Sequence, residues 1–345
     1  MNIHKKVLGT LDMVYAATAM QIGGELNYIA ASEGQNGCVA YHADSFEKQI
    51  IWDARGGTMN VIPLPDRDGE FIATQGFYPT FAAQESRIVY GKFENGQWNE
   101  QPIMTIPYLH RFDIFKLNGA LYFIGATLCT SKKNQDDWSD PGKVYVGKLH
   151  KNIAEPFELT TVLEGITKNH GFCAAIWHKK RAYIVTGVEG AFVIYLPENN
   201  EGFTCEKILD HEISDIAVAD IDGDGMDEIA TLEPFHGNKG VIYKNIAGSW
   251  QQIYACNLAF AHVVWGGSIL NKPSFIIGER KGDTKLLCIQ AKEHAAEALE
   301  VTLIDHTGGT SNIAVVHHHD KDVILAANRE IGETAIYELT EGKEL

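Results

Sequence analysis

The sequence predicts an all-β fold, a seven-bladed β-propeller with four-stranded antiparallel blades in a single domain over residues 1–345. Three observations predict it. A unit of strand, tight turn, strand, loop, strand and variable outer strand repeats along the chain. The mean spacing of the units is about 50 residues, and a four-stranded blade needs about 40–50. Seven units fill the chain, and β-branched and aromatic residues with frequent turn signals favour strands over helices.

The repeat is clearest in apolar strands that begin at Ala120, Ala182, Ser274 and Val323, each preceded by a shorter strand and a turn. It is weaker in the first two units. We expect the innermost strands of the seven blades to begin near Tyr15, Gly76, His110, His170, Asp215, His262 and Asn312. The N-terminal segment is expected to add an outer strand to the last blade, because this would cover exposed strand edges.

The composition restricts the class of partner. A formal net charge of −16 argues against nucleic acid and against anionic membranes. The six cysteines are scattered without a CxxC pair, and no stretch reaches the ~20 apolar residues of a membrane span. The N-terminus lacks the pattern of a signal peptide, so we expect a cytoplasmic protein with reduced cysteines. Homo-oligomerisation stays open.

Propeller geometry predicts one polar site. The starts of the first strands and the ends of the second strands reach the same face, and three of the seven predicted starts are His110, His170 and His262. Neutral imidazoles suit a catalytic divalent metal such as Zn, Mn or Mg, with open positions left for substrate. The alternative is that these histidines cap strands and bond to the backbone of neighbouring blades.

Two further residues are candidate catalytic groups. His236, in EPFHGN, could complete the metal shell or act as a base, or it could be a surface-loop histidine. Tyr78 could transfer a proton, or it could be a packing residue. The run of three histidines at 317–319 is expected to be a solvated turn.

Other residues near the predicted face could bind substrate. Arg280 and Arg329 occupy matching places in adjacent units and suit carboxylates or sugar hydroxyls, although salt bridges between blades would use them equally well. Glu233 ends a second strand on the same face. Trp138 lies in a polar insertion, residues 131–143, that is either a lid with an indole for stacking on a sugar or an inert decoration.

An aspartate-rich loop predicts a second cation site. Residues 220–228 read DIDGDGMDE, in which Asp220, Asp222 and Asp224 alternate and Glu228 closes the shell. Alternate oxygen donors in a tight loop suit one hard cation, so we expect a structural Ca²⁺ or Mg²⁺. The alternative is an acidic turn without metal.

Two resemblances follow from these motifs. The segment AVADIDGDGMDEIATLE resembles the FG-GAP or VCBS repeat of integrin-type propellers. The motifs NHGF at Asn169, EPFHGN at Glu233, HVVWGG at His262 and ILAANREIGETAIYEL at Ile324 resemble the propeller domain of aldos-2-ulose dehydratase and related bacterial proteins. The likeness runs from about His110 onward, and the chain has no room for the cupin domains of the fungal enzyme.

This second resemblance implies a metal-dependent carbohydrate lyase or dehydratase, which eliminates water or a glycosidic substituent from an oxidised (keto) sugar. The metal would polarise the ketone, and His236 or Tyr78 would remove the adjacent proton. Two alternatives stay open. One is a non-catalytic propeller that binds a glycan or a protein, and the other is a metal-dependent sugar or lactone hydrolase.

Overall fold

The computed structural model describes residues 1–198, 202–292 and 295–342. It contains seven four-stranded antiparallel sheets, so the predicted all-β, seven-bladed propeller is confirmed. In the described ranges the helical elements are two short 3₁₀ turns, η1 (Ala83–Glu85) and η2 (Arg329–Ile331). The chain forms two compact units, one of residues 8–170 and 332–334, the other of residues 1–7, 171–331 and 335–345. That the whole chain is one domain stays a prediction.

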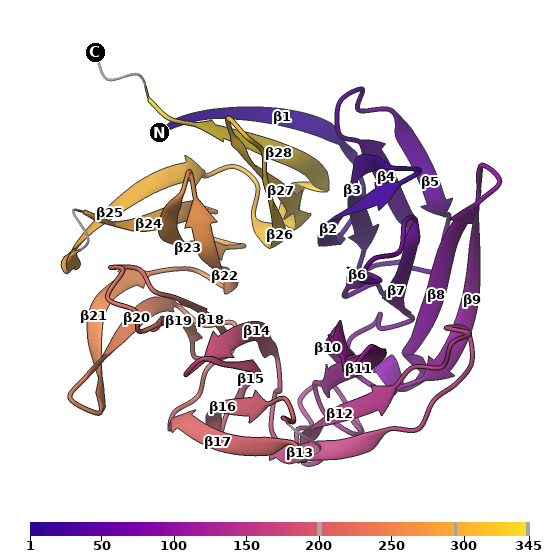
Figure 1. Cartoon of the computed structure of the whole chain (residues 1–345), viewed down its shortest axis with the longest axis horizontal. Coiled ribbons are helices and arrows are strands. Elements are labelled where there is room, and N and C mark those ends of the chain that lie inside the picture. Colours follow the sequence, from indigo (N-terminus) through magenta and orange to yellow (C-terminus); the bar gives the residue numbers. More distant parts are fainter. Residues whose placement is uncertain (199–201, 293–294, 343–345) are drawn as a thin grey trace. The chain divides into compact units, whose positions relative to one another are not determined.

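The unit of residues 8–170 contains three complete blades (Figure 1). The first consists of β2 (Val14–Ile22), β3 (Glu25–Ser32), β4 (Cys38–His42) and β5 (Lys48–Trp52). The second consists of β6 (Val61–Pro63), β7 (Glu70–Gln75), β8 (Arg87–Glu94) and β9 (Gln97–Thr105). The third consists of β10 (Leu109–Leu117), β11 (Ala120–Thr127), β12 (Gly142–Lys148) and β13 (Thr160–Ile166).

The other unit contains the remaining blades. The fourth has β14 (Gly171–Trp177), β15 (Lys180–Gly187), β16 (Gly190–Tyr195) and β17 (Thr204–Leu209). The fifth has β18 (Asp215–Ala219), β19 (Glu228–Glu233), β20 (Lys239–Ile246) and β21 (Ser249–Asn257). The sixth has β22 (Ala261–Ile269), β23 (Lys272–Glu279), β24 (Leu286–Lys292) and β25 (Ala295–Asp305). The seventh has β26 (Thr310–His317), β27 (Asp322–Asn328), β28 (Glu333–Thr340) and β1 (Asn2–Thr10).

The seventh blade joins the two ends of the chain in one sheet. Its strand order is β1-β28-β27-β26, so the N-terminal strand is the outer strand, as predicted (Figure 1). Pairing with β1 covers the backbone edge that β28 would otherwise expose.

The predicted start of the second blade near Gly76 is wrong. Its first strand is β6, and Gly76 instead follows the second strand, β7. The strand β6 is only three residues long and ends in Pro63, so it shows neither alternation nor an apolar run by which it could be recognised.

Burial follows the position of a strand within its blade. The second strands β3, β7, β15, β23 and β27 are almost continuously buried, whereas the outer strands β1, β9, β17 and β21 alternate or are largely exposed. A strand covered by protein on both faces needs apolar side chains on both, which explains the unbroken apolar runs in the sequence.

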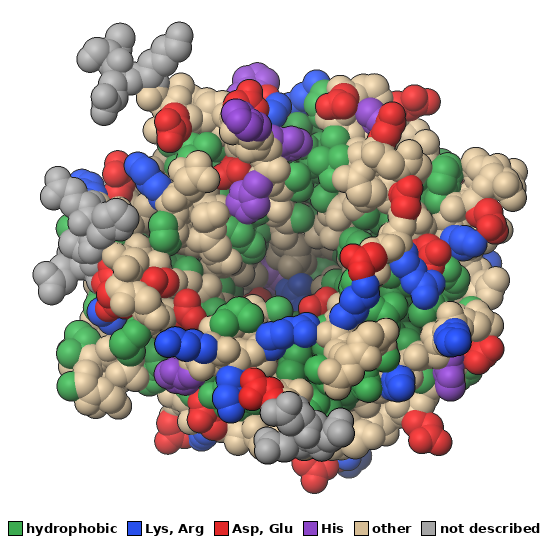
Figure 2. Space-filling view, viewed as in Figure 1, with side chains coloured by type: hydrophobic (Ala, Val, Ile, Leu, Met, Phe, Trp, Pro, Cys, Tyr) green, Lys and Arg blue, Asp and Glu red, His purple; other side chains and the backbone are tan. Residues whose placement is uncertain are grey.

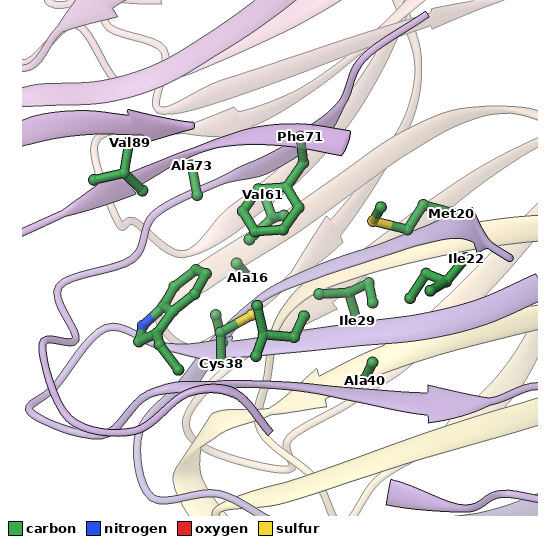
Figure 3. Packing of buried hydrophobic residues seen from close by; sticks show 13 residues of the cluster. Ala16, Met20, Ile22, Ile29, Cys38, Ala40, Val61, Phe71, Ala73 and Val89 are labelled. Carbon is green, nitrogen blue, oxygen red and sulfur yellow. The ribbon is translucent and has the colours of Figure 1, made fainter. Parts of the chain in front are cut away.

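Neighbouring blades share their apolar cores. In one cluster, side chains of β2, β3 and β4 pack against those of β6, β7 and β8 (Figure 3). Phe71 is at its centre and is fully buried, with ring centroids 5.9 Å from Trp52 and 5.6 Å from Trp98. Burial of such a ring stabilises the fold through apolar area removed from water and through close contacts.

The surface has mixed charge. Acidic and basic side chains are interspersed over the face shown in Figure 2. Among the described residues, no helix has the length and apolar character needed to cross a bilayer. All six cysteines are free thiols, and burial raises the pKa of Cys38 and Cys129.

We predict that Phe71→Ala lowers the free energy of unfolding by about 3–5 kcal/mol, because it leaves a cavity between two blades. The control is Ile50→Ala, at a side chain that is 60% exposed, which should change it by less than about 0.5 kcal/mol. Urea denaturation of both variants measures the difference. Equal effects would show that the shared core does not stabilise the fold.

Candidate functional site

The first strands of several blades begin with a buried polar residue. His110 is the second residue of β10, His262 is the second residue of β22, and His170 directly precedes β14. Their exposures are 4%, 2% and 2%, so each imidazole is inside the protein and not on a solvated edge. Buried polar groups need partners, and at the end of a sheet these can be a ligand as well as backbone.

A β-bulge recurs at the second position of the first strand. In four blades the register between first and second strand shifts by one residue there, which leaves one residue outside the ladder. The four extra residues are Tyr15, His110, His262 and Ser311. Bulges re-aim a side chain and free backbone groups from the ladder, and they are common beside active sites. The sequence gives no direct sign of them.

In the unit of residues 8–170, His110 is surrounded by rings. Its ring centroid is 4.4 Å from that of His170 and 5.5 Å from that of Phe77. The hydroxyl of Tyr15 lies 3.4 Å from Nε2 of His110, a weak hydrogen bond between two bulge residues. This arrangement gives His110 an oriented ring next to His170.

In the other unit, a hydrogen bond orients His262. Its Nδ1 lies 2.7 Å from the carbonyl oxygen of Ser311, the bulge residue of the neighbouring blade. A carbonyl only accepts, so Nδ1 carries the proton and Nε2 of the neutral ring carries the lone pair. Metal-binding histidines are commonly fixed in this way by a carbonyl behind the ring.

His236 is held by its backbone and by two aromatic rings. It follows β19 in a left-handed conformation with φ of 48°, and its N–H donates to Oγ of Ser214 at 3.1 Å. Its ring stacks on Phe235 and Phe260 with centroids 4.1 and 4.6 Å away, and lies 5.4 Å from that of His262. A left-handed backbone is uncommon for non-glycine residues, although histidine adopts it more readily than most.

Three imidazoles are close enough to share one ion. His170, His236 and His262 each present one ring nitrogen, and these nitrogens all lie within 4.8 Å of one another. His170 is the last residue of the unit of residues 8–170, and its peptide bond to Gly171 joins it to β14. Around a tetrahedral ion the nitrogens would be about 3.4 Å apart, which small ring movements could reach. The residues therefore fit a divalent metal that prefers nitrogen.

This group contains His236 in place of one predicted ligand. His170 and His262 were predicted as ligands together with His110, which is outside this group; its ring lies 4.4 Å from that of His170, with the two ring planes tilted by 34°. His236 lies in a loop after a second strand, β19. Its place in the sequence did not show which of the other histidines it would lie near. The roles of these residues stay predictions.

The two predicted substrate-binding arginines share one carboxylate. Arg280 directs Nε and Nη2 to Oε1 of Glu330 at 2.8 and 2.5 Å, and Nη1 of Arg329 lies 3.2 Å from the same oxygen. Burial acts to raise the pKa of Glu330, but the two guanidinium groups outweigh it and hold that pKa below its ordinary value. Arg280 also lies 4.9 Å over the ring of Phe260, the residue that stacks on His236.

Glu233 belongs to a hydrogen-bonded cluster. Its Oε1 accepts from Nε2 of His211 at 2.9 Å, from the hydroxyl of Thr231 at 2.6 Å and from that of Tyr243 at 3.0 Å. Burial acts to raise the pKa of Glu233, but these donors lower it overall. The same contact raises the pKa of His211 above 6.5.

The remaining two candidates lie in loops. Tyr78 is 42% exposed, after β7. Trp138 lies in the predicted insertion, where Nζ of Lys132 is 3.3 Å from its ring centroid. A lysine therefore covers one face of the indole that was predicted to stack on a sugar.

The aspartate loop offers a second cluster. Asp220, Asp222 and Asp224 each present one oxygen within 4.8 Å of the others, so the cluster could bind a metal. The ammonium of Lys244 lies against Asp222 and Asp224.

We predict that His211→Ala destabilises the protein in a pH-dependent way. The pKa of His211 is raised in the folded state, so its contribution is complete below the ordinary value and is lost as the pH rises through the folded value. Urea denaturation should show a larger loss of stability at about pH 6 than at about pH 9. The control is His150→Ala, at an exposed histidine. A pH-independent loss would contradict the His211–Glu233 ion pair.

The sequence matches no protein family and no curated protein. Solved structures do match. A 6-phosphogluconolactonase-like protein of Bacteroides uniformis is 11% identical with a TM-score of 0.58, over 96% of this chain and 93% of that one. Saccharomyces cerevisiae Sqt1 is 9% identical with a TM-score of 0.56, over 99% of both chains. A glucose dehydrogenase is 12% identical with a TM-score of 0.51, over 98% of this chain and 100% of that one. At these identities the likeness shows the fold alone.

Proposed function

We propose that the protein is a metal-dependent carbohydrate lyase or dehydratase that eliminates water or a glycosidic substituent from an oxidised (keto) sugar. The observation that carries the proposal is the group of His170, His236 and His262, whose ring nitrogens lie within 4.8 Å of one another. Three nitrogen ligands leave coordination positions open, which distinguishes a catalytic from a structural metal site.

The sequence resemblance supports the same group. Three of the motifs that resemble aldos-2-ulose dehydratase are NHGF, EPFHGN and HVVWGG, and they contain His170, His236 and His262 respectively. Motifs about 66 and 26 residues apart in the chain therefore supply the ring nitrogens of one cluster. We assign the three histidines as ligands of one divalent ion.

A bound divalent ion would polarise the ketone oxygen and acidify the neighbouring C–H bond. With His236 assigned as a ligand, His110 is the best-placed base, because its ring lies 4.4 Å from that of His170 and Tyr15 orients it. The imidazole of His110 takes the proton from carbon, and the C–H electron pair forms the C=C bond as the β C–O bond breaks. The imidazolium returns the proton to the leaving oxygen, so water or an alcohol departs.

A metal-dependent lactone or sugar hydrolase is the second candidate. The same open positions could activate water for attack on a carbonyl. One of the matched structures is 6-phosphogluconolactonase-like, although its likeness to this chain extends to the fold alone. The products separate the candidates, because elimination creates a conjugated C=C–C=O group that absorbs in the ultraviolet and hydrolysis does not.

We predict that His236→Ala and His262→Ala each weaken Zn²⁺ or Mn²⁺ binding by at least about 100-fold, because each removes one of three ligands. The metal content of protein dialysed against each ion, measured by plasma mass spectrometry, gives the result. His318→Ala, at an exposed histidine in the turn before β27, is the control and should bind as the wild type does. Unchanged metal content in both site variants, with unchanged circular dichroism, would overturn the proposed metal centre.

The variant His110→Ala tests whether His110 acts as the base or as a metal ligand. We predict that it retains the metal but lowers the rate of elimination from 2-keto and 3-keto sugars by about 100-fold or more, followed as ultraviolet absorbance. Loss of the metal would show that His110 is a ligand. Hydrolysis products without an absorbing product would favour the second candidate.

A further inference from the structure

The aspartate loop has the residue spacing of a calcium site, yet a lysine of the same blade, Lys244, lies against its carboxylates. We propose that the ammonium of Lys244 occupies the place of the divalent cation, so that the loop is closed by the chain itself and binds no metal. This inference is independent of the proposed function, because the loop and the histidine group share no residue.

The loop has the backbone of a cation site. It connects β18 to β19, with Gly223 and Gly225 at φ of 74° and 88°, values that glycine adopts without strain. The N–H of Gly225 donates to Oδ2 of Asp220 at 2.9 Å, and that of Ile221 to Oε2 of Glu228 at 2.9 Å. These bonds turn the carboxylates toward the inside of the loop.

Lys244 reaches into this loop from the adjacent strand, β20. Its Nζ lies 2.8 Å from Oδ2 of Asp222, 2.7 Å from Oδ2 of Asp224 and 2.8 Å from Oε1 of Glu228. An ammonium group has three N–H donors, and each of the three has its own carboxylate here. The oxygens that would bind the ion therefore already coordinate a cation.

The charges show why one cation is required. Glu228 is 1% exposed, and its burial raises its pKa. Burial also acts to lower the pKa of Lys244, but contact with three carboxylates raises it overall, so the side chain is charged at neutral pH. Without that charge, the carboxylates would repel one another in a partly buried loop.

A divalent ion and Lys244 compete for the same space. Calcium binds oxygen at about 2.3–2.6 Å, close to the observed N–O distances of 2.7–2.8 Å, so both cannot lie between the same three oxygens. Oδ1 of Asp220 is buried and accepts no hydrogen bond among the described residues, so a fourth carboxylate would be ready for an ion once Lys244 was removed.

The test is calcium binding by the wild type and by Lys244→Met, measured by titration calorimetry. We expect no binding by the wild type at about 1 mM Ca²⁺, and binding at one site at least about 100-fold tighter in the variant. The thermal midpoint of Lys244→Met should fall in EDTA and recover in CaCl₂, whereas that of the wild type should be equal in both.

Three further variants make the result specific. Lys239→Met, at an exposed lysine on the same strand, should behave as the wild type does, and Lys244→Arg should also not bind calcium, because it keeps the charge. Adding Asp224→Asn to Lys244→Met should abolish the new binding. Wild-type binding that is lost in Asp224→Asn would overturn the proposal, and so would a folded Lys244→Met that binds no calcium.

Discussion

The burial of the second strand of each blade is the constraint on which the rest of the structure depends. Strands such as β15 and β27 are covered on both faces, so their side chains must be apolar almost without interruption. Within these strands the buried polar side chains are small, such as those of Thr74 and Thr231, and the buried imidazoles lie near strand starts. His110, His170 and His262 all lie at such positions. The same requirement that builds the apolar core thus gathers the polar residues.

The bulges at the starts of the first strands determine how the polar side chains there are presented. A bulge releases one residue from the ladder, and in four blades that residue is Tyr15, His110, His262 or Ser311. The carbonyl of Ser311 fixes the ring of His262, and the hydroxyl of Tyr15 contacts His110. Aromatic stacking places His236 beside His262. Backbone irregularity and ring packing together therefore determine which nitrogens can meet.

Sequence reasoning could predict the features that are local or repeated. The apolar second strands predicted the blades. The shared position of His110, His170 and His262 at the starts of first strands led to the prediction that these three hold one metal ion, and this stays a prediction. Sequence reasoning failed at β6, because three residues ending in Pro63 carry no period. It could not rank His236 against His110, since loop conformation and stacking decide that choice. The contact between Lys244 and Asp222 could not be predicted either, because it depends on the pairing of β19 with β20.

The most direct test of the account is a crystal structure of the protein grown with Mn²⁺, with anomalous diffraction data collected at a wavelength where manganese scatters strongly. We expect one strong anomalous peak within coordination distance of ring nitrogens of His170, His236 and His262, and no peak in the aspartate loop, where Lys244 should remain. An anomalous map without a peak at the three histidines, or with the three rings directed to different places, would contradict the account.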